Sequence, residues 1–414
     1  MKRLVKSFRR LFSTPLVWQR VRRSRVLIYG SSGSEIIKNY LAEEAAIYKH
    51  PDHEINIWVA AAAIRRFQLS REGYLHAYLR MVRPSVVITM EDNDLLFYRI
   101  QALIPTCGTL AIQNGRRDHF AGSRAGGFFE QASSLRECLE IGATYIAVFG
   151  AAIGNLYTES LGIHESRVIP IGSIRNNAVA ETEPRYESRI IYISSMPNFA
   201  LGGHPESDEI LAYYHGSPVT YRKNWLAEKL AVTYASQFAH NTNRPFVVLG
   251  KRSSMHGGES QYYSELLRES KWSFVPCENQ ASSYRYITHD DICVAVDGTL
   301  AYEMFGRGYR VAFLSGRLKS AGLGQFLDCN FGFPLVLPNR GPFWTDEIST
   351  SEVERVLRYV STSDAKEWEN ATGEWREQLM VHDPMNKRLC DLLEELGVAT
   401  TGPRYWQNAL IPSN

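Results

Sequence analysis

Short apolar runs alternate with longer amphipathic stretches from Arg25 onward. Five such runs occupy residues 26–29, 55–60, 86–90, 109–113 and 145–149, and each of them ends in polar or glycine-rich residues. Runs of this length, separated by helical patterns, are typical of a parallel β-sheet covered by helices. Ligands of such sheets bind beyond the carboxyl ends of the strands, so we expect binding groups directly after the runs.

A second series of the same kind follows a break in the pattern. Residues 178–188 are polar, acidic and without periodicity, and new apolar runs then occupy residues 190–194, 246–249, 272–275, 292–296 and 310–314. A helical pattern covers residues 225–240, and a charged helical tail covers residues 350–396. A chain of 414 residues, 44% of them apolar, is long enough to form two domains.

We therefore predict an α/β protein with two Rossmann-like domains whose parallel sheets face a central cleft. The predicted divisions are a basic leader (1–24), an N-terminal domain (25–177), a linker (178–188), a C-terminal domain (189–345) and a helical tail (346–414). We expect the tail to pack on the C-terminal domain. A return of the tail to the N-terminal domain is left open at this point.

Positive charge is concentrated in the leader. The first 25 residues contain nine Lys or Arg and no acid, whereas the rest of the chain contains 37 basic and 44 acidic residues. A negative remainder argues against nucleic acid as a partner. Leu4, Phe8 and Leu11 lie at helical spacing among the basic residues, which favours a helix on the surface of an anionic membrane.

Three alternatives for the leader remain, namely a basic segment without a partner, a helix packed on its own domain and a mitochondrial-type presequence. No stretch reaches the roughly 18 apolar residues that span a bilayer, and a signal-peptide cleavage site is absent. The six cysteines stand far apart without a Cys-x-x-Cys pair, which indicates reduced thiols, no disulfide framework and no zinc site. We expect a protein on the cytoplasmic face of the inner membrane.

The clearest candidate for an anion site is the sequence Asp297-Gly298-Thr299, which directly follows the run 292–296. A helix begins at once, so its free backbone N–H groups and the positive end of its dipole would face a diphosphate above the sheet. Glu303 lies one turn further on the same face, where its carboxylate could accept hydrogen bonds from ribose hydroxyls. The alternative is an ordinary capped turn.

Two further strand ends of the C-terminal domain belong to the predicted donor site. Lys251 and Arg252 follow the run 246–249, and Ser194 and Ser195 follow or end the run 190–194. Two cations opposite an anion-favouring helix would neutralise a departing diphosphate. Protein charge would then replace a metal ion, so we predict no metal. A loop with both cations facing water is the alternative.

Two strand ends of the N-terminal domain carry the candidate catalytic groups. Three acidic residues lie within the four that follow the run 86–90, and their mutual repulsion could raise a pKa into the range of a general base. An amide, two guanidinium groups, a carboxylate and an imidazole follow the run 109–113. The catalytic candidates are Glu91, Asp92, Asp118 and His119, and the substrate-binding candidates are Asn114, Arg116 and Arg117. Solvated loop ends are the alternative.

Ser31 and Ser32 lie in the glycine-rich loop after the first run. The G-x-G-x-x-G spacing of a dinucleotide site is absent, so we place this loop on the acceptor side of the cleft as part of the substrate-binding set. The G-x-S-x-G pattern of a nucleophilic serine is absent as well.

Several of these motifs, taken in order, resemble a family of bacterial surface-carbohydrate biosynthesis proteins that is similar to glycosyltransferases with the B fold. The resemblance rests on E-D-N-D-x-x-F-Y-R, A-I-Q-N-G-R-R-D, Y-I-A-V-F-G, I-G-S-I-R-N-N and D-G-T-L-A-Y-E, and it covers about residues 25–314. It implies that donor phosphate and ribose bind at Gly298, Thr299 and Glu303. It also implies acceptor and catalytic roles for the set Asp92, Asn114, Arg116 and Asp118.

The favoured interpretation is a metal-independent glycosyltransferase that moves a sugar from a nucleotide-sugar to a surface-polysaccharide or lipid-linked glycan acceptor. Asp92 or Asp118 would deprotonate the acceptor hydroxyl, and the groups at 251, 252 and 299 would stabilise the departing nucleotide. No cofactor is predicted, because the nucleotide-sugar is a co-substrate. Two alternatives are a sugar-nucleotide epimerase of the same fold and a non-catalytic component of a glycan assembly system.

Overall fold

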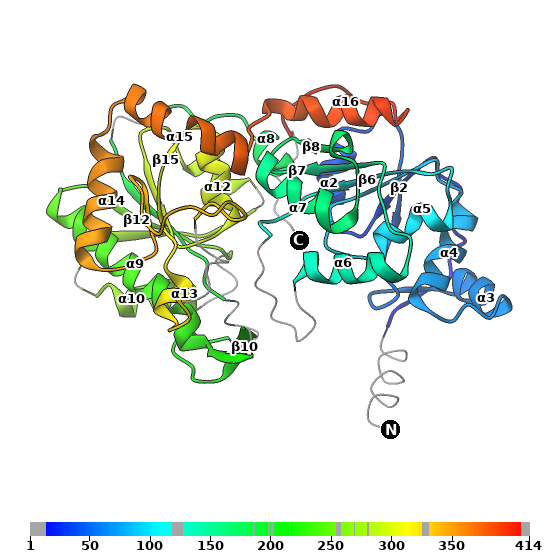
Figure 1. Cartoon of the computed structure of the whole chain (residues 1–414), viewed down its shortest axis with the longest axis horizontal. Helices are drawn as coiled ribbons and strands as arrows, with labels where there is room; N and C mark the ends of the chain where they lie inside the picture. The colour runs from blue at the N-terminus through cyan, green and yellow to red at the C-terminus, as the bar shows by residue number, and fades with distance from the viewer. Residues whose placement is uncertain are drawn as a thin grey trace.

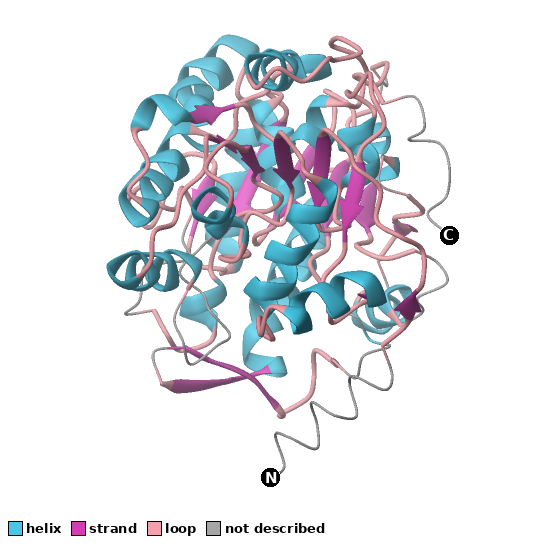
Figure 2. Ribbon diagram, turned by 90° about the vertical axis from the view of Figure 1, so that its right-hand side faces the viewer, coloured by secondary structure: helices cyan, strands magenta, loops and turns pink. Residues whose placement is uncertain are grey.

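Figure 1 shows two α/β halves side by side, each built on one twisted sheet. The computed structural model describes residues 14–117, 127–184, 187–197, 199, 203–214, 216–253, 258–268, 270–279, 281–324 and 331–406. Figure 2 looks at the first half end on, and its strands form a layer between helices.

The first sheet contains six parallel strands. In spatial order they are β3 (Ala46–Tyr48), β2 (Val26–Tyr29), β5 (Val86–Thr89), β6 (Gly108–Ile112), β7 (Tyr145–Val148) and β8 (Val168–Pro170). All four residues of β2 and of β5 are buried, because helices cover both faces of the sheet. This explains why these strands read as continuous apolar runs.

One predicted strand of the first half is wrong. Of residues 55–60, only β4 (Ile55–Asn56) is extended, and it pairs with β1 (Leu16–Val17) outside the main sheet. The side chain of Asn56 then accepts hydrogen bonds from the N–H groups of Trp58 and Val59 and starts helix α3 (Ile57–Arg65). The position beside β2 is taken by β3, which is too short to stand out as a run. The alanine-rich stretch therefore forms a helix.

The second sheet also contains six parallel strands. Their spatial order is β13 (Trp272–Val275), β12 (Phe246–Leu249), β9 (Ile190–Ile193), β14 (Ile292–Ala295), β15 (Arg310–Leu314) and β16 (Trp344–Thr345). The predicted strands are confirmed within one residue, and the predicted helix is α9 (Tyr221–Asn241), capped by the side chain of Thr220. The prediction of two parallel sheets is thus confirmed.

Further helices surround both sheets. The first half contains α2 (Ser34–Lys38), α4 (Arg71–Val82), α5 (Ile100–Leu103), α6 (Phe128–Cys138), α7 (Ala151–Leu161) and α8 (Ile174–Asn177). The second half contains α10 (Glu259–Leu266), α11 (Ser282–Tyr286), α12 (Thr299–Gly306) and α13 (Arg317–Ser320), together with a hairpin of β10 (Ile210–Tyr214) and β11 (Ser217–Thr220).

The C-terminal helices contact both halves. Helix α14 (Thr350–Thr362) packs on β15 and α9, and α15 (Ala365–Leu379) packs on α7 of the first half and α12 of the second. Helix α16 (Lys387–Glu395) lies over the first half (Figure 1), where Leu389 and Leu393 join the core formed by Val26 and Ile28. The described C-terminal helices therefore lead back to the first half. The residue bounds of the domains stay a prediction.

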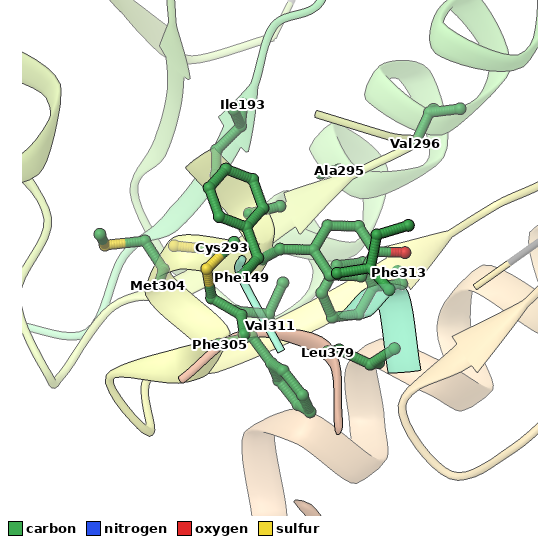
Figure 3. Close-up of a cluster of buried hydrophobic side chains, with 14 of the residues drawn as sticks. Phe149, Ile193, Cys293, Ala295, Val296, Met304, Phe305, Val311, Phe313 and Leu379 are labelled. Carbon is green, nitrogen blue, oxygen red and sulfur yellow. The ribbon is translucent and has the colours of Figure 1, made fainter. Parts of the chain in front are cut away.

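The interface between the halves is tightly packed. Phe149 of the first half and Leu379 of α15 lie among Phe305 and Phe313 of the second half (Figure 3), and all of them are nearly inaccessible to solvent. A Cβ atom on Gly306 would lie 2.5 Å from the carbonyl oxygen of Met380. This close approach fixes the relative position of the halves and so defines the space between them.

Candidate functional site

The order of the strands shows where a ligand would bind. Strands β9 and β14 are neighbours in the second sheet, but the chain leaves them toward opposite edges, β9 toward β12 and β14 toward β15. The loops after such a pair diverge and leave a crevice, which is the preferred ligand site of open α/β sheets. Ser194 directly follows β9, and Asp297 is the second residue after β14.

A pocket of about 530 Å³ lies at this crevice. Its lining includes eight of the residues predicted from the sequence, which are Asn114, Ser194, Ser195, Lys251, Asp297, Gly298, Thr299 and Glu303. Asn114 comes from the first half, and the other seven come from three separate segments of the second half. Residues of both halves thus line the same pocket. Arg252 does not line it.

The first wall is the start of helix α12. Gly298 precedes the helix with a φ of 134°, and as a glycine it has no side chain that could cap the helix start. A Cβ atom at Gly298 would meet no atom within 4 Å, so this turn opens into space. The hydroxyl of Thr299 accepts a hydrogen bond of 3.3 Å from the backbone N–H of Arg116 in the first half. An uncapped start of this kind offers N–H donors and a positive dipole end to an anion.

The second wall is the loop after β12. The backbone N–H groups of Lys251 and Arg252 donate to the carboxylate of Glu259, which also accepts from the hydroxyl of Ser194. These bonds fix the loop, so the exposed side chain of Lys251 lies in the pocket wall. Desolvation by the wall, together with the charge of Arg252, lowers the pKa of Lys251.

Three charged side chains close the floor of the pocket. The guanidinium of Arg317 donates to both oxygens of Asp297 at 2.7 and 2.9 Å, and it also pairs with Glu228. Although burial opposes it, the positive charge of Arg317 lowers the pKa of Asp297 to about 2. Two carboxylates on one guanidinium make Arg317 an organising group, and Asp297 stays ionised.

Glu303 joins the two halves. It is buried, and its carboxylate accepts hydrogen bonds from the hydroxyls of Ser173 in the first half and Tyr284 in the second. The side chain of Asn176 also donates to the backbone oxygen of Glu303 at 3.1 Å. Burial raises the pKa of Glu303. Both oxygens thus have partners before any ligand binds, although the residue lines the pocket.

Glu91 behaves differently from the sequence-based expectation. Its half-buried carboxylate accepts from the backbone N–H of Ser32 at 3.3 Å and lies 2.9 Å from Nε2 of His50. The hydrogen bond from His50 lowers the pKa of Glu91, and burial opposes this effect. The expected rise caused by neighbouring carboxylates is therefore wrong, because an imidazole and amide N–H groups stabilise the charged form.

Asp92 lies inside the fold. Its side chain has no exposed surface and accepts from Nε of Arg117 at 3.1 Å, from the hydroxyl of Tyr157 and from the backbone N–H of Asn114 at 3.0 Å. No acceptor hydroxyl can reach a carboxylate enclosed in this way. This enclosure argues against Asp92 as a general base. Arg117 pairs with the same carboxylate, and its substrate-binding role stays a prediction.

The remaining first-half candidates bridge toward the pocket. Asn114 donates from its side chain to the hydroxyl of Ser32 at 3.1 Å, which links the two predicted loops. Arg116 donates to the hydroxyl of Tyr302 at 3.2 Å and lies over its ring. Arg116 thus acts across the interface of the halves. Ser31 is exposed beside this network. Asp118 and His119 lie outside the described residues.

Sequence reasoning missed several residues of the site. Glu228, Arg317, Tyr284 and Trp225 were not predicted, although all but Glu228 line the pocket. The sequence contains a signal for Glu228. This acid lies on the buried face of α9 together with the apolar residues Ala227, Ala231 and Val232. An acid on an apolar helix face predicts a buried partner. The partner itself, 89 residues away, leaves no local pattern.

Two searches concern other kinds of site. Among the described residues, no group of three or more His, Cys, Asp or Glu side chains could hold a metal ion. No helix in the described part of the chain is long and apolar enough to cross a membrane. The predicted absence of a metal stays a prediction, and the amphipathic pattern of residues 4–12 lies outside the described residues.

Comparison with known proteins gives a family and a fold. Residues 110–397 match the model of a family described as "putative O-antigen biosynthesis protein". None of the curated proteins matches this chain.

Among solved structures, a UDP-N-acetylglucosamine 2-epimerase homologue from Listeria monocytogenes is 10% identical with a TM-score of 0.51, over 94% of this chain and 100% of the other. A variant of the wall teichoic acid polymerase TagF is 9% identical with a TM-score of 0.50, over 90% of this chain and 88% of the other. At these identities the likeness concerns the fold alone, and it confirms the predicted glycosyltransferase B architecture.

Proposed function

The chain belongs to the family of O-antigen biosynthesis proteins whose model matches more than half of its length, and from that premise we propose that it is a glycosyltransferase. It transfers a sugar from a nucleotide-sugar to a surface-glycan or lipid-linked acceptor without a metal ion. The observation that supports this most directly is the pocket of about 530 Å³ between the halves, with an uncapped helix start and a lysine in its walls.

The donor diphosphate would bind between the start of α12 and Lys251. Backbone N–H groups at residues 298–300 and the dipole of α12 would hold its oxygens, and the ammonium group of Lys251 would neutralise the charge that grows on the leaving phosphate. Arg317 and Asp297 would keep the floor rigid. Because Arg252 lies outside the pocket lining, we assign its predicted role to Lys251 alone.

The acceptor would bind on the side of the first half. Its hydroxyl oxygen attacks the anomeric carbon, the bond from that carbon to the phosphate oxygen breaks, and a general base takes the hydroxyl proton. Of the predicted carboxylates, Glu91 is half-buried and ionised, and Ser32 and Asn114 connect it to the pocket. We therefore propose Glu91, assisted by His50, as the base. Asp118 and His119 remain further candidates.

Residues 1–24 would hold the protein on the cytoplasmic face of the inner membrane. These residues include eight Lys or Arg and no acid that would be repelled by an anionic lipid surface. Each basic side chain near such a surface contributes about 1 kcal/mol. A lipid-linked acceptor would then be within reach of the enzyme.

The test begins with donor binding. Purified protein is melted with UDP-, GDP-, dTDP- and CMP-sugars, and one of them at about 100 times its dissociation constant should add about 2.7 kcal/mol of stability. The stabilising donor is then incubated with lipid-linked glycan acceptors, and we expect the nucleotide to be released only when acceptor is present. A Lys251→Ala variant should lose about half of this stabilisation, whereas Arg252→Ala should keep it.

Three outcomes distinguish the alternatives. Conversion of the donor into a second nucleotide-sugar without acceptor would indicate the epimerase of the same fold. Stabilisation by a donor with neither transfer nor conversion would favour the non-catalytic assembly component. If no nucleotide-sugar stabilises the protein, the proposed donor site is wrong.

A further inference from the structure

Helix α3 presents apolar residues to solvent. Its sequence is IWVAAAAIR, and the face with Val59 and Ala63 is buried against α4. The opposite face carries Trp58 and Ile64, whose exposed fractions are 39% and 60%. A surface helix normally has a polar outer face, and a helix that is apolar all round is normally covered on all sides. The outer face of α3 therefore lacks the covering that its sequence calls for.

The turn after α3 exposes a phenylalanine at an unfavourable backbone position. Phe67 is the second residue after the end of α3. Its φ is 57°, and its side chain is 93% exposed. Glycine or asparagine is preferred at such a left-handed helix end, because a bulky side chain is strained there. An exposed aromatic ring that costs the fold stability points to a role outside the fold.

Apolar exposure is concentrated in this corner. Among the described residues, twelve large hydrophobic side chains are exposed, and six of them lie in residues 16–18 and 58–69. We call these six the α3 corner: Leu16, Trp18, Trp58, Ile64, Phe67 and Leu69. Scattered exposed apolar residues need no explanation, but a concentration of this kind marks an interaction surface.

Printed contacts hold the two segments of the α3 corner together. Strand β1, with Leu16, pairs with β4 directly before α3. The indole N–H of Trp58 donates to the backbone oxygen of Trp18 at 2.8 Å, and the guanidinium of Arg20 lies 4.7 Å from the centre of the Trp58 ring. Figure 1 shows α3 at the outer end of the first half, away from the second sheet.

Within the two segments that form the α3 corner, the charged residues have one sign. Residues 14–25 and 55–70 contain no Asp or Glu. Six arginines in these segments are exposed, namely Arg20, Arg22, Arg23, Arg25, Arg65 and Arg66. In the sequence, five more basic residues precede Thr14, where the described chain enters this corner. Apolar and aromatic residues ringed by cations match the interface of a bilayer with anionic lipids.

We propose that the α3 corner is a membrane-contact surface that inserts its apolar side chains into the interface of an anionic bilayer. It would act beside the basic leader, so that the protein has two contacts and a fixed orientation on the membrane. Two weak membrane contacts give stable anchoring where one gives reversible binding. This surface deepens the proposed membrane location and does not depend on sugar transfer.

Sedimentation of the full chain with vesicles tests the proposal. We compare phosphatidylcholine vesicles with and without phosphatidylglycerol, and we expect binding only to the anionic vesicles. The variant Phe67→Asn should reduce the partition coefficient at least about ten-fold when combined with Ile64→Gln. The matched control is Val336→Asn, which removes an apolar side chain of 92% exposure from another part of the surface and should change nothing.

The melting temperature separates a binding role from a structural one. Asparagine tolerates the left-handed conformation better than phenylalanine, so Phe67→Asn alone should melt at the same temperature as the wild type or higher while it binds vesicles less well. Unchanged vesicle binding by the double variant would overturn the proposal. So would a wild-type dimer that the double variant converts to monomer, because a second copy would then cover the surface. Donor-induced stabilisation, measured on the same samples, reports on the proposed enzyme independently.

Discussion

Each sheet has a carboxylate shortly after a central strand, and the two carboxylates have different surroundings. Asp92 is the third residue after β5, and Asp297 is the second residue after β14. Asp92 and Asp297 each form an ion pair with an arginine. The side chain of Asp92 has no exposed surface, because Tyr157 and the backbone of Asn114 complete its shell. The side chain of Asp297 is 24% exposed and lines the pocket. The same sequence pattern thus produces a structural ion pair in one half and a pocket wall in the other.

Removing the two carboxylates should separate these roles most clearly. Asp92→Ala leaves the Arg117 guanidinium buried without its partner, so we expect the free energy of unfolding to fall by about 3–5 kcal/mol. Asp297→Ala should cost less, since solvent and Glu228 both remain near Arg317. Urea unfolding measures both losses. Equal losses would remove the distinction between the two sites.

The sequence predicted most of the framework for physical reasons. Strands that are buried on both faces read as apolar runs, and nine of the twelve strands of the two sheets lie on the predicted runs. The three exceptions are β3, β8 and β16. The strand prediction for residues 55–60 was wrong because a short apolar run fits either a strand or a helix. The N-cap at Asn56 favours the helix.

The site was predictable where it follows from strand ends. Lys251, Gly298 and Thr299 reach one pocket because β12 and β14 both flank β9. The roles of single side chains were less predictable. Asp92 and Glu91 are adjacent in sequence, yet Asp92 is enclosed and Glu91 is half-exposed. Successive residues of an extended chain point in different directions.

Glu91→Gln should have the next largest effect and tests the base on the first-half side. If Glu91 accepts the acceptor proton, transfer should slow by about 100-fold or more while donor binding stays unchanged. Because the pKa of Glu91 lies below its ordinary value, the wild-type rate should stay level from neutral pH down to about pH 5. A rate that falls already between pH 7 and 6 would indicate a different base, such as His119.

Acid should weaken the second-half network by a smaller amount. The pKa of Asp297 is lowered to about 2, against about 3.9 in an unfolded chain. A lowered carboxyl pKa stabilises the fold above the unfolded value, and this stability is lost as the pH falls toward 2. This difference in pKa corresponds to about 3 kcal/mol. Asp297→Asn should therefore flatten the loss of stability between pH 4 and pH 2, and an unchanged slope would contradict the ion pair.

Lys251→Ala should have the smallest effect and concerns the ligand alone. Loss of one charge-assisted contact to a phosphate should weaken donor binding by about ten-fold, or about 1.4 kcal/mol, without a change in unfolding, because the fixed bonds of this loop run through its backbone. Since the pKa of Lys251 is lowered, wild-type affinity should begin to fall at a pH below that of an ordinary lysine as the cation loses its proton. Calorimetric titration of wild type, Lys251→Ala and Arg252→Ala at low and high salt checks this. Equal losses of donor affinity in both variants would indicate that the whole loop attracts the donor through its net charge. Lys251 would then have no specific contact with the donor.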